Sequence, residues 1–155
     1  MSDGRLLVVW HSNSGRTQQM VDALLAGARD PEAGDTEVRD VPALEAIADD
    51  FRWATGVLLA TPAHFGYMSG ALKHCFDTVY EPLLDDTRGL PYALVVKGRS
   101  DTDGAVAAVH KIVTGLAWKE VQPPLTVVGD LTDDHLTAAT ELGQTMAAGL
   151  ALGIF

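Results

Sequence analysis

A run of hydrogen-bonding side chains at residues 12–17 suits the binding of a phosphate group. It directly follows the apolar run LLVVW at residues 6–10, within the stretch HSNSGRTQQM. The side chains concerned are those of Ser12, Asn13, Ser14, Arg16 and Thr17. Gly15 lets the backbone approach a ligand, and a helix that begins here adds free N–H groups and the positive end of its dipole. The stretch therefore predicts a site for a phosphate monoester, and a polar helix cap without a ligand is the alternative.

Other phosphate-binding and catalytic motifs do not match this loop. A nucleoside triphosphatase loop needs a lysine after its last glycine, and a Rossmann loop needs three spaced glycines, whereas the loop holds only Gly15 and Arg16. A serine hydrolase elbow needs a glycine two residues before its serine, and Ser12 stands there instead. A cysteine phosphatase needs a thiolate in the loop, and Cys75 is far away in the sequence.

A second stretch, TPAHFGY, covers residues 61–67 and follows the apolar run VLLA. Pro62 and Gly66 favour a turn, and the aromatic residues Phe65 and Tyr67 stand beside them. Aromatic rings at a binding edge stack on flat ring systems, but such rings also pack beneath loops. Taken alone, the stretch is consistent with either role.

Apolar runs that alternate with amphipathic segments predict an α/β fold. Strands are expected at residues 6–10, 36–41, 57–60, 92–96 and 125–128, and helices at residues 17–28, 69–80, 105–116 and 133–152, with a short one at 44–51. Four strands are continuously apolar, which indicates a parallel sheet covered on both faces, whereas TEVRDV alternates and indicates an edge strand. The expected architecture is one doubly wound domain over residues 1–155, with ligands beyond the carboxyl ends of the strands.

Together the two stretches resemble motifs of the flavodoxin-like FMN-binding family. SNSGRT at residues 12–17 is similar to the flavodoxin phosphate loop, T/S-x-T/S-G-x-T. TPAHFGYMSGALKHCFD at residues 61–77 resembles the TPxYFGxMSGxLKxFFD segment of NAD(P)H:quinone oxidoreductases and NADPH-dependent FMN reductases, above all the tryptophan-repressor-binding protein branch. The resemblance spans essentially the whole chain. It implies a five-stranded parallel sheet of order 2-1-3-4-5 with helices on both faces, and FMN at the switch point between the first and third strands.

The resemblance also implies which residues contact the cofactor. The FMN phosphate would be held by Ser12, Asn13, Ser14, Gly15, Arg16 and Thr17, and the isoalloxazine would be contacted by Pro62, Ala63, His64, Phe65 and Gly66. His64 could also donate a proton to a reduced quinone or flavin, which makes it a candidate catalytic residue.

The stretch KGRSDTDG after the fourth strand departs from the family pattern. In the family this loop flanks the other edge of the flavin ring, often with an aromatic residue, and here it has none and contains two aspartates. Gly98 permits close approach of a ligand, and Arg99 or Lys97 could favour negative charge at N1 of the reduced flavin. The alternative is a solvated loop whose aspartates cap the next helix.

Composition sets the outer limits. The formal net charge is −10 at pH 7, which disfavours nucleic acid and anionic membranes, and no apolar run approaches the ~18 residues of a membrane span. The N-terminal residues lack the apolar core of a signal peptide, and Cys75 is the only cysteine, so a cytoplasmic location is expected. His64, His74 and Cys75 are not expected to converge on a metal, and Cys75 is expected to be an inert core thiol.

Three function classes remain open. The first is an NAD(P)H-dependent FMN oxidoreductase that passes electrons to a quinone, a flavin or a similar small acceptor. The second is an electron carrier that serves a redox protein partner without NAD(P)H activity of its own, and the third is a flavin-free binding domain. The TPAHFGYMSGALK stretch favours the first, whereas the acidic charge suits docking on basic partners and favours the second. A homodimer is compatible with the resemblance.

Overall fold

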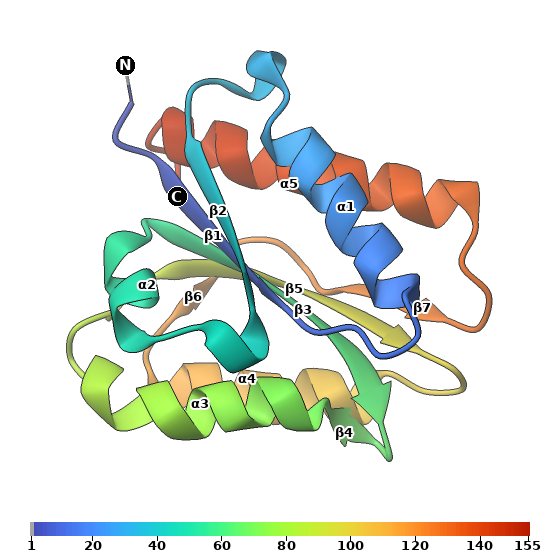
Figure 1. Ribbon diagram of the computed structural model, residues 1–155. Coiled ribbons are helices and arrows are strands. Elements are labelled where there is room, and N and C mark those ends of the chain that lie inside the picture. Colours follow the sequence, from blue (N-terminus) through green and yellow to red (C-terminus); the bar gives the residue numbers. More distant parts are fainter. Residues whose placement is uncertain (1) are drawn as a thin grey trace.

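A twisted sheet with helices on both faces forms the structure, a computed structural model that describes residues 2–155 (Figure 1). The strands are β1 (Arg5–Trp10), β2 (Glu37–Pro42), β3 (Gly56–His64), β4 (Tyr67–Met68), β5 (Pro91–Gly98), β6 (Lys119–Glu120) and β7 (Leu125–Val128). The α-helices are α1 (Arg16–Ala28), α2 (Ala48–Trp53), α3 (Gly70–Leu83), α4 (Asp103–Gly115) and α5 (Asp133–Ala151), and the short 3₁₀ helices are η1 (Pro31–Ala33) and η2 (Ala43–Glu45). None of the helices in this described range has the length and apolarity that crossing a lipid bilayer requires.

The sheet has the strand order that the sequence predicted. Neighbouring strands run β2-β1-β3-β5-β6, and β7 also lies beside β5. These pairings are parallel, and only β4 runs antiparallel, to β3. The described residues form seven strands instead of the predicted five. One addition is the short β4, and the other arises because residues 121–124 (VQPP) interrupt the last strand with two prolines that lack an N–H group.

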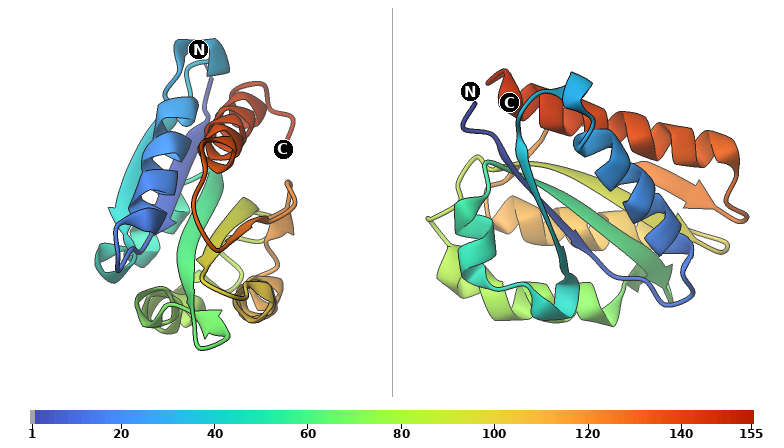
Figure 2. Two further views of the ribbon diagram at one scale, coloured as in Figure 1. Left: turned by 90° about the vertical axis from the view of Figure 1, so that its right-hand side faces the viewer. Right: turned by 45° about the horizontal axis from the view of Figure 1, so that its top comes forward.

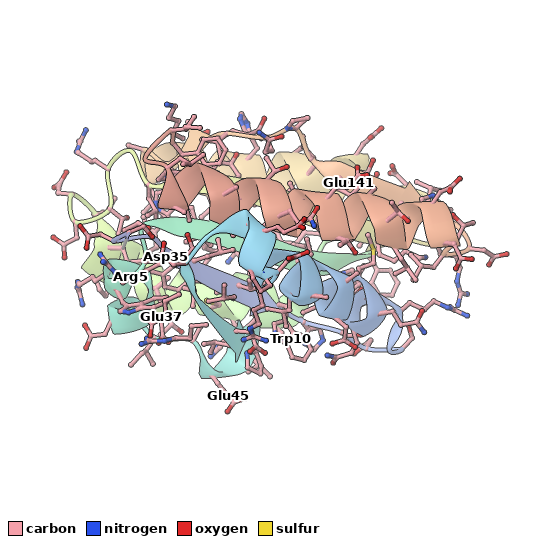
Figure 3. All side chains as sticks on the ribbon, turned by 90° about the horizontal axis from the view of Figure 1, so that it is seen from above. Arg5, Trp10, Asp35, Glu37, Glu45 and Glu141 are labelled. Atoms are coloured by element: carbon pink, nitrogen blue, oxygen red, sulfur yellow. The ribbon has the colours of Figure 1, made fainter. Side chains whose placement is uncertain are left out.

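The helices divide between the two faces of the sheet, as a doubly wound fold requires. α1 and α5 lie side by side on one face, and α2, α3 and α4 cover the other (Figure 1, Figure 2). Figure 3 looks down on the layer of α1 and α5, and shows Arg5 and Trp10 at opposite ends of β1. The carboxyl ends of the parallel strands therefore meet at one edge of the sheet, next to the start of α1.

Alternating strand residues contribute to two separate apolar cores. Val8 and Val95 belong to the core under α1 and α5, whereas Val9 and Val96 belong to the core on the other face. Successive residues of a strand point to opposite faces of the sheet. The residue after Val96 in β5 therefore points back to the face that α1 and α5 cover.

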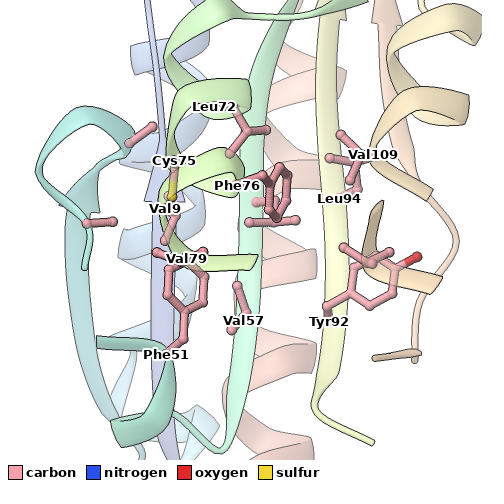
Figure 4. Close-up of a cluster of buried hydrophobic side chains, with 14 of the residues drawn as sticks. Val9, Phe51, Val57, Leu72, Cys75, Phe76, Val79, Tyr92, Leu94 and Val109 are labelled. Carbon is pink, nitrogen blue, oxygen red and sulfur yellow. The ribbon is translucent and has the colours of Figure 1, made fainter. Parts of the chain in front are cut away.

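The core under α3 and α4 is rich in aromatic rings. Figure 4 shows Phe51, Phe76 and Tyr92 packed between the sheet and the helices of this face. The Trp118 ring centroid lies 5.7 Å from that of Phe51, 6.4 Å from that of Phe76 and 6.1 Å from that of Tyr92. The indole N–H of Trp118 donates to Oγ1 of Thr87 at 2.9 Å. Trp118 is thus a buried core residue.

Two expected elements have different bounds in the structure. The helix expected at residues 44–51 is divided into η2 and α2, because Ala46 and Ile47 are extended. The third strand continues to His64, which therefore lies on a strand and not on a loop. The backbone oxygen of Ala60 accepts a hydrogen bond from the N–H of His11, so Ala60 faces β1. Pro62, two residues later, faces the same side, but β1 has ended by then. The missing N–H of Pro62 therefore costs no hydrogen bond between strands.

Candidate functional site

The predicted phosphate loop joins β1 to α1 at the carboxyl edge of the sheet. Gly15 is the N-cap residue of α1 and has a left-handed backbone with φ of 88°, which glycine adopts readily. The hydroxyl oxygen of Ser12 accepts hydrogen bonds from the N–H groups of Gly15 (3.1 Å) and Gln18 (3.2 Å). In the described part of the chain, the N–H groups of Arg16 and Thr17 have no acceptor. The loop therefore offers backbone donors at the positive end of α1.

β3 turns back into β4 through a two-residue hairpin. His64 pairs with Tyr67, and the turn residues Phe65 and Gly66 have φ of 52° and 72°. Two successive left-handed residues are typical of a type I′ turn, but this conformation is strained for a bulky residue. The side chain of Phe65 is nevertheless fully exposed. Strain and exposure thus occur in the same aromatic residue, which leaves its ring free to contact another molecule.

Contacts on both sides fix the position of the hairpin. A Cβ added to Gly104 at the start of α4 would lie 1.9 Å from the carbonyl oxygen of Gly66, so the glycine allows the two backbones to touch. Oγ1 of Thr61 accepts a hydrogen bond from the N–H of Ser69 at 3.0 Å. The hydroxyl oxygen of Ser69 in turn caps α3 by accepting from the N–H of Leu72 at 3.2 Å.

The end of β5 brings a buried cation to the same edge. The side chain of Lys97 is only 8% exposed, and its Nζ donates to the backbone oxygen of Gly98 at 3.1 Å. Burial, and then the nearby charge of Arg16, lower the pKa of Lys97, and Arg99 adds to this effect while Asp130 opposes it. From the sequence, Lys97 was named only as an alternative to Arg99 near N1 of the reduced flavin. Its place directly after the apolar run YALVV was the one signal that it ends a buried strand.

The three segments together line a pocket of about 280 Å³. Its lining residues are Asn13, Ser14, Arg16, Thr17, Pro62, Ala63, His64, Lys97 and Arg99. All of them were named from the sequence, Lys97 only as an alternative to Arg99. The structure thus brings together side chains from three stretches that are far apart in the sequence.

The other predicted residues shape the surroundings of the pocket. Ser12 and Gly15 fix the loop by the contacts described above, and Phe65 and Gly66 form the hairpin tip. A Cβ at Gly98 would lie 2.2 Å from the carbonyl oxygen of Asp101, so the turn after β5 itself requires this glycine. Oδ1 of Asp101 accepts from the N–H of residue 103 at 2.9 Å, which agrees with an aspartate that supports the start of α4.

One end of the site suits an anion and the other suits a flat ring. Hydroxyls, N–H groups and cations surround the loop, whereas the hairpin presents Phe65. FMN carries a phosphate monoester and a flat isoalloxazine, so this set of donors and the exposed ring fit both parts of the cofactor.

Sequence comparison connects this site to a family. The family described as NADPH-dependent FMN reductase matches residues 11–132, which include the loop, the hairpin and β5. This chain belongs to that family. Membership confirms FMN as the cofactor and places the chain among the flavodoxin-like oxidoreductases.

Two relatives of this FMN reductase family member are similar over different lengths. An NAD(P)H dehydrogenase (quinone) from Acidithiobacillus ferrooxidans (strain ATCC 53993 / BNL-5-31) is 32% identical over 168 residues, which cover 94% of this chain and 84% of that protein. A flavodoxin from Aquifex aeolicus (strain VF5) is 34% identical over 86 residues, which cover 56% of this chain. The match spans only 45% of the length of that flavodoxin.

Solved structures confirm the flavodoxin-like fold. A flavodoxin from the domain Archaea has a TM-score of 0.78 at 18% identity, covering 94% of this chain and 98% of its own. A flavodoxin, WrbA-like protein from Agrobacterium tumefaciens has a TM-score of 0.75 at 16% identity, covering 93% and 95%. At these identities the likeness concerns the fold alone.

Cys75 takes no part in the site. It lies on the buried side of α3, and burial, followed by the charge of Asp50, raises the pKa of Cys75 to about 12. The thiol therefore stays protonated, as expected of an inert core cysteine. Within residues 2–155, no group of three or more His, Cys, Asp or Glu side chains is placed to hold a metal ion.

Proposed function

We propose that this protein is an NAD(P)H-dependent FMN oxidoreductase that passes electrons to a quinone, a flavin or a similar small acceptor. The observation that carries the proposal is the meeting of a phosphate loop, a strained aromatic hairpin and a cationic strand end around one pocket. The match to the NADPH-dependent FMN reductase family supports a nicotinamide nucleotide as the donor. Similarity to an NAD(P)H dehydrogenase (quinone) supports a quinone as the acceptor.

In this proposal the loop at residues 12–17 binds the FMN phosphate. The hydroxyls of Ser14 and Thr17 and the amide of Asn13 donate to the phosphate oxygens, together with the free N–H groups at the start of α1. A Cβ added to Gly15 would meet no atom within 4 Å, so the backbone is open on the ligand side. Arg16 adds positive charge at the rim.

The hairpin positions the flat part of the cofactor. Phe65 supplies a stacking surface at the hairpin tip, and Pro62, Ala63 and His64 form a wall of the pocket. In this proposal the half-buried imidazole of His64 holds a proton for the acceptor. When bound, FMN itself supplies the hydride and electron chemistry, while these residues bind and orient it and limit the access of water.

A flavodoxin-type electron carrier is the second candidate function. The similarity to an Aquifex flavodoxin and the net charge of −10 support it, because an acidic surface suits docking on a basic redox protein. The two candidates share the FMN site and differ in whether a nicotinamide nucleotide reduces the cofactor directly.

Anaerobic reduction separates the two functions. The protein is loaded with FMN, and NADH or NADPH is added while the visible absorbance of the flavin is followed. A reductase loses this absorbance within the time of a turnover and regains it when a quinone is added. A carrier keeps it, although light-driven reduction of the same sample, as the control, still bleaches the flavin. The second result would contradict our proposal.

The proton-donor role of His64 has its own test. We expect His64→Ala to slow quinone turnover while FMN still binds, and His64→Gln to bind FMN equally well without restoring turnover. Unchanged turnover of His64→Ala would remove this role.

A further inference from the structure

The three cations at the pocket form no ion pair within the described residues, whereas five of the eight basic residues elsewhere do, and Arg5, Lys111 and Lys119 do not. Five basic side chains pair with carboxylates: Arg29, Arg39, Arg52, Lys73 and Arg88. Within residues 2–155, Arg16, Lys97 and Arg99 form no ion pair, although the formal net charge is −10 and carboxylates are abundant. Three positive charges that repel one another are thus gathered at one pocket, with Asp130 near Lys97 but too far away to form an ion pair.

Lys97 is the only one of the three cations whose side chain is buried. Arg16 and Arg99 are exposed, so water and salt screen their charges, whereas Lys97 is 8% exposed. Its ammonium group has three N–H bonds, and its one hydrogen-bond acceptor in the described chain is the backbone oxygen of Gly98. A buried charge with so few partners costs stability, unless a ligand completes its surroundings.

The strand register shows which end of the site Lys97 faces. Lys97 follows Val96 in β5 and therefore points to the face of α1 and α5, as Val95 does. Its electrostatic neighbours agree, because Arg16 begins α1 and Asp130 lies just before α5. The hairpin tip instead packs on α4, on the opposite face of the sheet. Lys97 is thus on the side of the phosphate loop and away from the exposed ring of Phe65.

We propose that Lys97 makes the site select a phosphorylated flavin, FMN, over riboflavin, because its buried ammonium group pairs with the phosphate held by the loop at residues 12–17. The inference rests on the proposed function, since it concerns the same FMN site. A phosphate monoester carries about −1.5 to −2 charges at neutral pH, which the free N–H groups and exposed arginines of the loop offset only partly. Charge pairing is strongest where water is excluded, so Lys97 contributes more than Arg16 or Arg99.

The test compares two flavins on two variants. Dissociation constants for FMN and for riboflavin are measured by the quenching of flavin fluorescence, with wild-type apoprotein, Lys97→Met and Lys119→Met. Methionine keeps the length of the side chain and removes the charge. Lys119 is an exposed lysine of β6 at the other end of the sheet, so Lys119→Met is the control for the change in net charge. Inorganic phosphate serves as a competitor in each titration.

We expect Lys97→Met to weaken FMN binding roughly 10- to 100-fold and to change riboflavin binding by less than about 3-fold. Inorganic phosphate should compete only weakly with riboflavin. It should compete with FMN, and more strongly in the wild type than in Lys97→Met. Lys119→Met should match the wild type with both flavins. Urea unfolding of the apoproteins should show Lys97→Met to be at least as stable as the wild type, because an unpaired buried charge is gone.

Three results would overturn the inference. If Lys97→Met weakened FMN and riboflavin binding equally, Lys97 would lie at the ring. If Lys97→Met left FMN binding unchanged, Lys97 would have no role in it. If Lys119→Met lost FMN binding to the same extent, the effect would come from the net charge. A wild-type protein that binds neither flavin would instead refute the FMN site of the proposed function. A wild type that binds FMN but is not reduced by NADH or NADPH would refute the reductase and leave the selectivity of Lys97 standing.

Discussion

Polar groups are partnered differently at the two ends of the parallel strands, the amino edge where the strands begin and the carboxyl edge where they finish. At the amino edge they are paired with one another: Nε of Arg5 donates to the carbonyl oxygen of Trp53, and Arg52 pairs with both Asp49 and Asp86. The indole N–H of the buried Trp118 likewise has its acceptor in Oγ1 of a threonine. This edge closes on itself, and its contacts serve the stability of the fold.

The carboxyl edge keeps similar groups without such partners. Arg16, Lys97 and Arg99 form no ion pair within the described chain, and the ring of Phe65 is held in solvent by a strained turn. The difference teaches that one sheet can separate the requirements of folding from those of binding, because strand direction assigns each to a different edge. Substitutions at the two edges should therefore have opposite consequences.

The largest effect is expected at the amino edge. Trp118→Ala removes a buried ring that contacts Phe51, Phe76 and Tyr92, and should lower the free energy of unfolding by about 3–5 kcal/mol. Urea denaturation of the apoprotein measures this change. Trp118→Phe keeps much of the ring and should lose less, and the folded fraction of either variant should bind FMN like the wild type. A weaker FMN affinity with unchanged stability would break the comparison.

The apolar layer between the edges gives a pH-dependent effect. Burial raises the pKa of Cys75 from 9.0 to about 12, so above pH 9 the unfolded chain loses the thiol proton while the native protein keeps it. The native state then binds more protons, and stability falls as the pH rises from about 9 towards 12. From pH 7 to pH 10 the wild type should lose about 1.4 kcal/mol more than Cys75→Ala. Equal losses in the two proteins, measured by urea unfolding, would show that this thiol ionises normally.

The smallest effect has the opposite sign and lies at the carboxyl edge. Phe65→Asn places a residue that tolerates left-handed backbone at a φ of 52°, and should raise the free energy of unfolding by about 1 kcal/mol. The same variant loses the stacking ring and should bind FMN roughly 5- to 10-fold more weakly. Leu44→Asn, which changes an exposed apolar residue far from the hairpin turn in sequence, is the control and should show neither change. A destabilised Phe65→Asn would contradict strain at this turn.

The resemblance of two sequence motifs to the flavodoxin-like family predicted the order of the sheet and most of the residues that line the pocket. Continuous apolar runs revealed parallel strands, and parallel strands bring the residues after them to one edge. The hairpin could not be predicted, because a proline in the sequence suggests that a strand has ended. Only the register shows that β1 ends before Pro62, which allows β3 to continue past this residue. The burial of Lys97 was not predicted either, because it depends on the tertiary packing around the end of β5.

The last strand was likewise predicted only in part from the sequence. LTVV predicted β7 correctly, but the two residues of β6 are too few to form a recognisable pattern and are defined only by their pairing with β5. Their separation by residues 121–124 follows from two adjacent prolines, whose effect on a sheet depends on which side of the strand faces a partner.

The break between β6 and β7 affects whether the sheets of two molecules can pair with each other. A border of unpaired amides invites a foreign strand to extend the sheet, and long flat borders nucleate fibrils. Here one border is broken by Pro123 and Pro124 into pieces of two and four residues, and the other, β2, carries Glu37, Arg39 and Asp40. Neither offers a long uncharged template, so crowded copies of this chain are protected from growing into a shared sheet.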